Sequence, residues 1–297
     1  MFRCLAVLSL IAAMIIAACG GASPTPAPTV PSLAAFDVRV GSSDIALGPN
    51  RLLLGISTRD GTPLGKATVL VRFFALDSAT PSTPRGESSA LYLGDAPDAP
   101  QALYAARVTL DQTGGWEAEA TLSKPGAEPV TKRASFRVKA NPDVPFPGQP
   151  APASVNQTIG ATPIEQLTSQ RPPGDPDLYR LTIADALAQH KPLLVVFSTP
   201  AFCQSRTCGP QMEAVQRLKA QYAAQMNFIH IEIFDRPDLL IQGQGTQRLR
   251  QAVAEWRLPT DPWTFLVTAQ GAVYDRFEGF APEYELQLST QAMLAGR

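Results

Sequence analysis

The pattern of hydrophobic and polar positions changes character along the chain and divides it into two parts. From about residue 34 to 140, apolar and polar residues alternate with a period of two, which indicates strands with one buried face. Turn-forming clusters such as Gly48-Pro49-Asn50 separate these runs. About six short strands without a helical pattern predict an antiparallel β-sandwich of immunoglobulin-like kind over 34–140. The alternating runs lie at 36–40, 52–56, 69–73, 104–110, 116–122 and 136–138.

Residues 158–297 combine helical patterns with apolar runs. A helical pattern around Ala184–Gln189 precedes the apolar run Leu193–Phe197, which is typical of a buried parallel strand. An α/β domain is therefore expected in this part. Its further elements are expected in the order helix, strand, helix, strand, strand, helix, at residues 209–222, 228–234, 246–256, 263–267, 273–277 and 282–295.

Two proline-rich stretches mark boundaries between these parts. Residues 19–33 contain prolines among small residues, which favours an extended stalk. Residues 141–157 hold five prolines and are interpreted as an interdomain linker.

The first 18 residues have the composition of a signal peptide. A basic start is followed by an apolar run too short to span a membrane comfortably. The run ends Ile16-Ala17-Ala18-Cys19, which resembles the lipobox of bacterial lipoproteins and implies lipidation of Cys19. We therefore expect a protein anchored in the cell membrane by lipid and facing outside the cytoplasm. An ordinary secretory signal or a short membrane anchor is the alternative.

Charge and cysteine content limit the classes of partner and chemistry that the sequence supports. The chain has 25 Lys and Arg against 26 Asp and Glu, and this balance argues against a nucleic acid partner. Of the four cysteines, Cys4 would leave with the signal and Cys19 would carry the lipid. Cys203 and Cys208 then remain as a close pair, and in an exported protein such a pair predicts a disulfide.

The C-terminal part resembles the thioredoxin family over about 130 residues. A strand, the loop with Cys203 and Cys208, and a helix opened by Gly209-Pro210 follow one another as in that family. The segment Trp256–Val267 resembles the family's approach to a cis-proline, and a closing hairpin turns at Gly271. The resemblance implies a thioredoxin-like fold, a cis bond between Asp261 and Pro262, and a role for these two residues in binding a substrate peptide.

The same resemblance implies that Cys203 and Cys208 are catalytic. The reactive species in disulfide exchange is a thiolate, which a helix N-terminus stabilises. Arg206 would add positive charge to the loop.

Three departures separate the sequence from the family's pattern. Four residues rather than two lie between the cysteines, Phe202 replaces the usual tryptophan, and Val196 stands where a buried aspartate is common. The sequence leaves open which cysteine attacks, and whether the disulfide is only structural.

Neither a metal site nor a cofactor is predicted. In the β part, the stretches at 48–54, 60–69 and 114–117 resemble YtkA-like domains, but this part has no cluster of His, Cys or Met. A set of two cysteines and one histidine is also similar to the copper site of copper-delivering thioredoxin relatives. Nothing in the sequence, however, places His190 or His230 beside the two cysteines.

The expected function is thiol–disulfide oxidoreduction on the thiols or disulfides of other exported proteins. The alternative is a non-enzymatic binding protein that uses the thioredoxin-like scaffold with a structural Cys203–Cys208 bond.

Overall fold

In the computed structural model of the protein, residues 36–96 and 99–296 are described. The predicted signal peptide, Cys19 and the stalk lie outside the described residues. Within 36–96 and 99–296, no helix combines the length and the apolar character that crossing a membrane requires.

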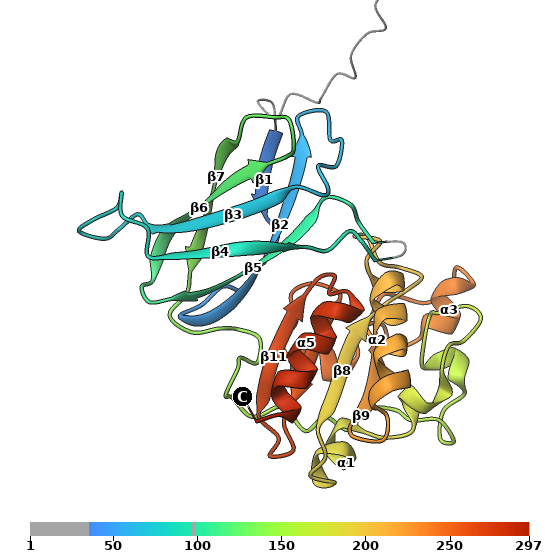
Figure 1. The fold of residues 1–297 in the computed structure, drawn as a ribbon. Coiled ribbons are helices and arrows are strands. Elements are labelled where there is room, and N and C mark those ends of the chain that lie inside the picture. Colours follow the sequence, from blue (N-terminus) through green and yellow to red (C-terminus); the bar gives the residue numbers. More distant parts are fainter. Residues whose placement is uncertain (1–35, 97–98, 297) are drawn as a thin grey trace, which may run out of the picture. The chain divides into compact units, whose positions relative to one another are not determined.

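The N-terminal part is an antiparallel β domain, as predicted (Figure 1). Its strands form one continuous, barrel-like sheet in the order β1-β2-β5-β4-β3-β6-β7, with β1 and β7 in contact. The sheet folds into two layers, β1-β2-β5 and β3-β6-β7. Strand β4 joins these layers, because it pairs with β3 and, at its end, with β5. The strands are β1 (Phe36–Val40), β2 (Gly48–Thr58), β3 (Thr68–Ala75), β4 (Gly86–Tyr92), β5 (Leu103–Leu110), β6 (Gly114–Ser123) and β7 (Val130–Val138).

The alternating apolar positions form the core of this domain. Leu52, Phe73, Tyr104 and Trp116 are fully buried between the two layers. Strand β4 was not predicted, because most residues on its inward face are small and this face is only partly buried.

The C-terminal part is built on a four-stranded sheet in the order β11-β10-β8-β9. Strands β8 and β9 are parallel, and β10 runs antiparallel to both β8 and β11. The strands are β8 (Leu193–Ser198), β9 (Asn227–Glu232), β10 (Trp263–Val267) and β11 (Val273–Glu278). The helices are α1 (Ile183–Ala188), α2 (Cys208–Tyr222), α3 (Pro237–Ile241), α4 (Gln251–Glu255) and α5 (Glu283–Leu294).

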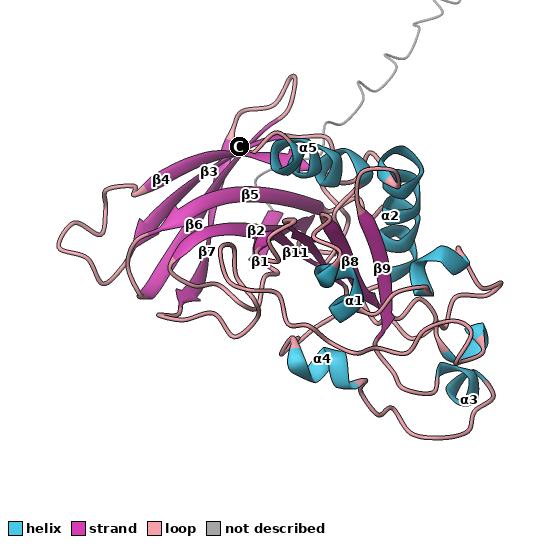
Figure 2. Ribbon diagram, turned by 90° about the horizontal axis from the view of Figure 1, so that it is seen from below, coloured by secondary structure: helices cyan, strands magenta, loops and turns pink. Residues whose placement is uncertain are grey.

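Helices cover both faces of this sheet (Figure 2). Alternate residues of β8 point to opposite faces: Val195 packs with α1 and α4, and Val196 packs with α2 and α5. The predicted elements are confirmed, except that the helix expected over 246–256 is limited to α4. Helix α3 and the short helical segments at Ile164–Gln166 and Pro176–Tyr179 were not predicted.

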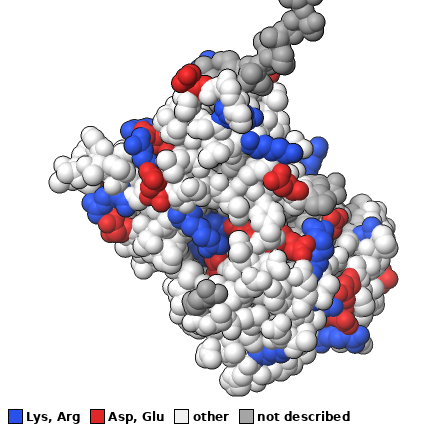
Figure 3. Space-filling view, in the orientation of Figure 1, with Lys and Arg blue, Asp and Glu red and all other residues white. Residues whose placement is uncertain are grey.

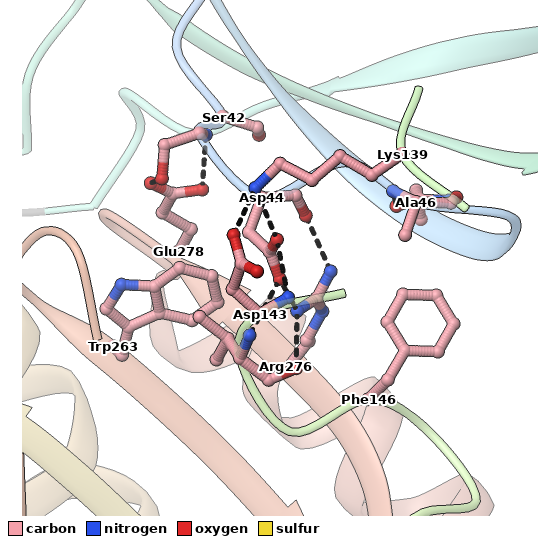
Figure 4. Close-up of polar contacts among 12 residues, drawn as sticks. Ser42, Asp44, Ala46, Lys139, Asp143, Phe146, Trp263, Arg276 and Glu278 are labelled. Carbon is pink, nitrogen blue, oxygen red and sulfur yellow. Dashed lines mark hydrogen bonds and ion pairs between the residues drawn. The ribbon is translucent and has the colours of Figure 1, made fainter. Parts of the chain in front are cut away.

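Buried polar contacts join the β domain to the C-terminal domain. Asp44 pairs with Arg276 of β11 at 2.6 Å, and both side chains are almost fully buried (Figure 4). Arg51 of β2 pairs with Glu285 of α5 at 2.7 Å, again out of solvent. Because such ions are costly to leave unpaired, these contacts hold the two domains in one arrangement.

The proline-rich segment 141–157 connects the two domains and is itself packed. Val144 is fully buried in the core of the C-terminal domain, and the Gly148 N–H donates to the carbonyl of Val273 at 2.8 Å. Pro150 forms a bridge with Ala272. The segment therefore lies along the sheet edge at β11.

Candidate redox site

The two cysteines lie in the loop between β8 and α2 and are joined by a disulfide, as predicted, with their Cα atoms 6.0 Å apart. Helix α2 begins at Cys208, one residue before the predicted start. Pro210 lies in the first turn, where the missing N–H costs no intrahelical hydrogen bond. The pair thus sits at the N-terminus of a 15-residue helix.

The environments of the two sulfur atoms differ. Cys208 is fully buried, whereas Cys203 is only partly buried. The Cys208 N–H, one of the free donors of the first helical turn, points at Cys203 Sγ at 3.3 Å. Ser205 Oγ lies 3.2 Å from the same sulfur. Cys203 therefore has both the more accessible sulfur and the donors that stabilise a thiolate.

The loop between the cysteines is exposed and tightly turned. Arg206 is exposed and adopts a left-handed φ of 59°. Within the described ranges its side chain makes no hydrogen bond or ion pair, so the predicted electrostatic role of Arg206 stays a prediction. Phe202, which takes the place of the usual tryptophan, packs against Phe234 with ring centroids 5.9 Å apart.

The segment that precedes β10 completes the site. The Asp261–Pro262 bond is cis, as predicted. Asp261 Oδ1 lies 3.3 Å from Cys208 Sγ. The Pro262 carbonyl accepts the Gly279 N–H at 2.8 Å, which ties the segment to the end of β11. Burial raises the pKa of the Asp261 carboxyl.

A hydrogen-bond chain links this segment to the β domain. The Thr260 hydroxyl donates to Glu278 at 2.8 Å. Glu278 also accepts the Ser43 N–H at 2.7 Å and the Ser43 hydroxyl at 2.5 Å. The β domain is thus connected to the residue next to Asp261.

Buried polar groups support the cysteine loop from the side of β9. Glu232 is buried and accepts the Ser169 N–H at 2.6 Å, while Ser169 Oγ accepts the Ala201 N–H at 3.1 Å. Burial raises the pKa of Glu232. These residues were not predicted, because they come from separate segments and share no local spacing.

The histidines do not join the cysteine pair. His230 Nδ1 lies 2.8 Å from the Tyr179 hydroxyl, and Nε2 lies 3.0 Å from the Ser198 hydroxyl. Burial lowers the pKa of His230 to about 4, so it is neutral at pH 7. Both ring nitrogens of His230 therefore face hydroxyl groups.

Within the described part of the chain, one group of carboxylate, thiol or imidazole donors lies close enough together for one ion. It consists of Cys203, Cys208 and Asp261, whose donor atoms lie within 4.8 Å of one another. Here the two sulfurs are bonded to each other and are not the free thiolates that soft metal ions bind. The arrangement in this structure is that of a disulfide facing a carboxyl group.

A separate cleft has neither cysteine in its lining. It has a volume of about 660 Å³ and is lined by residues of β2, β4, β5, β11 and α5. Its arginines are already paired, Arg51 with Glu285 and Arg107 with Asp275. Basic and acidic side chains are also interspersed over the face drawn in Figure 3. The cleft therefore offers no uncompensated charge to a ligand through these arginines.

Comparison with known families agrees with this geometry. Residues 179–293 match the model of the thioredoxin-like domain family. The C-terminal part of the chain is a thioredoxin-like domain. The match covers both cysteines, Asp261 and Pro262, so the thioredoxin-like domain contains the whole candidate site. No curated protein is similar enough in sequence to count as a match.

Solved structures resemble the chain only distantly. CopC from Methylosinus trichosporium is 13% identical with a TM-score of 0.21, covering 32% of this chain and 81% of that one. MtrC from Shewanella baltica is 13% identical with a TM-score of 0.24, covering 36% of this chain and 22% of that one. A conjugative transposon lipoprotein from Bacteroides eggerthii is 8% identical with a TM-score of 0.20, covering 35% of this chain and 97% of that one. These scores are too low to support any argument about function.

Proposed function

We propose that this protein is a thiol–disulfide oxidoreductase that acts on the thiols or disulfides of exported proteins. The observation that carries the proposal is the Cys203–Cys208 pair at the N-terminus of α2, facing the cis-Pro262 segment of a thioredoxin-like domain. A helix N-terminus favours a thiolate, and disulfide exchange proceeds through a thiolate.

Cys203 is the attacking residue in this proposal. In the reduced protein its thiolate attacks one sulfur of a substrate disulfide, and the other substrate sulfur leaves as a thiolate that takes up a proton. Cys208 then attacks Cys203 Sγ in the mixed disulfide, which releases the second substrate sulfur and closes the Cys203–Cys208 bond. Two electrons pass from the protein to the substrate, and the reverse sequence oxidises a substrate dithiol. Asp261 and Pro262 supply the backbone against which the substrate peptide lies.

A trapping experiment tests this assignment. Cys208→Ser leaves the attacking cysteine but removes the resolving one, so we expect it to accumulate mixed disulfides with exported proteins. Cys203→Ser should trap far less, because Cys208 is buried. The double variant is the matched control and should trap nothing. Equal, background-level capture by both single variants would contradict the proposal.

The alternative is a binding protein in which the disulfide only staples the loop. The full burial of Cys208 favours this alternative. The reduction potential separates the two: structural disulfides lie below about −300 mV, and catalytic pairs lie higher. A redox titration of the protein, with insulin reduction by dithiothreitol measured alongside, decides between them.

The location is a second part of the proposal. The sequence Ile16-Ala17-Ala18-Cys19 supports lipidation of Cys19 and anchoring in the cell membrane, with the domains outside the cytoplasm. Cys19→Ala should abolish labelling by a radioactive fatty acid and release or mis-process the protein. Unchanged membrane retention and mass would refute the anchor and leave the redox proposal intact.

A further inference from the structure

We propose that the Asp261 carboxyl group is the proton acceptor and donor for Cys208 during disulfide exchange. This inference rests on the proposed redox function and extends it to one further catalytic residue. It starts from the position of a carboxylate, contributed by the cis-proline segment, directly beside the buried sulfur.

Cys208 has little other means of exchanging its proton. Its side chain is fully buried, so bulk water does not reach the sulfur directly. In the disulfide the sulfur carries no hydrogen, and the 3.3 Å separation from Asp261 Oδ1 is a contact without a proton. On reduction the same geometry places a thiol S–H within hydrogen-bonding distance of the carboxylate.

The titratable groups on the other strands of this sheet are bonded to other partners. Glu232 of β9 is bonded to the backbone of Ser169, and His230 of β9 is held on both ring nitrogens. Glu278 of β11 faces Thr260 and Ser43. Val196 of β8 carries no ionisable group. Within the described ranges Asp261 itself has no ion-pair partner, and its partial burial favours uptake of a proton.

In the resolving step, a proton passes from Cys208 to Asp261, and the Cys203–substrate disulfide is replaced by the Cys203–Cys208 disulfide. The Asp261 carboxylate takes the proton from the Cys208 thiol, and the thiolate attacks Cys203 Sγ in the mixed disulfide. The Cys203–substrate bond breaks, and the substrate sulfur leaves with the electron pair. The protonated Asp261 returns its proton to the leaving thiolate or to solvent. Reversal of these steps opens the disulfide and protonates Cys208.

The first test measures the Cys208 thiol itself and needs no redox activity. The full chain carries Cys4→Ser, Cys19→Ser and Cys203→Ser, so that Cys208 is its one cysteine. Alkylation by iodoacetamide is followed against pH, with and without Asp261→Asn. Removing an adjacent negative charge should lower the thiol pKa, because the thiolate no longer faces a like charge. An unchanged pH profile would overturn the inference.

The second test measures the resolving step. The reduced full chain, with Cys4 and Cys19 replaced by Ser, reacts with 5,5′-dithiobis(2-nitrobenzoate) in a stopped-flow instrument. Attack by Cys203 releases the first thionitrobenzoate, and resolution by Cys208 releases the second. Asp261→Asn should leave the first phase within about twofold and slow the second at least tenfold at pH 7, since general bases typically contribute about 10² to 10⁴ in rate. Asp261→Glu should recover part of the second phase.

The second test separates proton transfer from a merely electrostatic effect of Asp261. Without its negative charge, Cys208 would be more often ionised and the second phase would become faster. A second phase that is unchanged or faster in Asp261→Asn therefore refutes proton transfer. Asp37→Asn, on an exposed position of β1, is the matched control and should alter neither phase. If the unaltered pair releases no second thionitrobenzoate, the redox proposal itself fails, and with it the role of Asp261.

Discussion

Replacing Asp44 by alanine tests how firmly the β domain is fixed to the thioredoxin-like domain. Asp44 is completely buried, and its carboxylate accepts from Arg276 at 2.6 Å. The same carboxylate accepts the N–H groups of Asp143 and Val144 and the Lys139 ammonium at 3.0 to 3.1 Å. Arg276 also donates to the carbonyls of Asp44 at 2.6 Å and Val144 at 3.3 Å, so the guanidinium would keep these two partners but lose the carboxylate bonded to it.

The expected loss is large because Arg276 would remain buried without the carboxylate that is hydrogen-bonded to it. Breaking a buried ion pair by removing one partner costs about 3 to 5 kcal/mol of unfolding free energy. Asp143→Ala is the matched control: Asp143 binds the same Lys139, but its side chain is 68% exposed. That change should stay within about 0.5 kcal/mol.

Denaturant unfolding followed by tryptophan fluorescence provides the measurement. A third variant, Asp44→Ala with Arg276→Met, replaces both charges and should recover much of the loss, since paired replacement of buried ions by apolar groups is often neutral. Burial alone raises the pKa of Asp44, but hydrogen bonds from Arg276, the Asp143 backbone and Lys139 outweigh it and lower that pKa. The stability that Asp44 contributes is therefore present above its unfolded pKa of about 3.9 and is lost as the pH falls through its lower folded value. If Asp44→Ala lowers the unfolding free energy by less than about 1 kcal/mol, the buried ion pair between the domains is refuted.

Three further predictions concern stability. Burial lowers the pKa of His230 from 6.5 to about 4, so the unfolding free energy should fall as the pH drops from 6.5 towards 4. At 1.36 kcal/mol per pKa unit this loss is about 3 kcal/mol. In urea titrations, the unfolding free energy of His230→Gln should depend correspondingly less on pH. Gly279 has a φ of 69°, and a Cβ there would lie 2.9 Å from a Leu53 methyl carbon, so Gly279→Ala should lower the unfolding free energy by at least about 1 kcal/mol; an unchanged melting temperature would contradict that strain. Phe280 is fully buried among Leu53 and Leu93 of the β domain, and Phe280→Ala should cost about 3 to 5 kcal/mol in chemical unfolding, whereas a loss below 1 kcal/mol would mean that this contact is not formed.

The sequence by itself determined the type and order of most elements. Alternation with period two predicted the β domain, because strands place successive side chains on opposite faces. The continuous apolar run Leu193–Phe197 predicted a strand buried on both sides, and β8 is fully buried between two helical layers. The resemblance of the segment around Pro262 to the thioredoxin family implied a cis bond and a segment next to the cysteines, and both are found. These features could be predicted because each depends on a few residues that are close together in the sequence.

Only the tertiary structure decided what surrounds each cysteine and how the domains meet. The burial of Cys208 and the partial exposure of Cys203 depend on how the loop packs, and the sequence left open which of the two attacks. Asp261 lies 53 positions from Cys208, and Glu278 lies 235 positions from Ser43. Such pairings have no local signal, because they arise where distant segments are brought together, within the C-terminal domain for Asp261 and between the two domains for Glu278. A carboxylate at the buried sulfur and a β domain fixed to the cis-proline segment therefore became visible only in three dimensions.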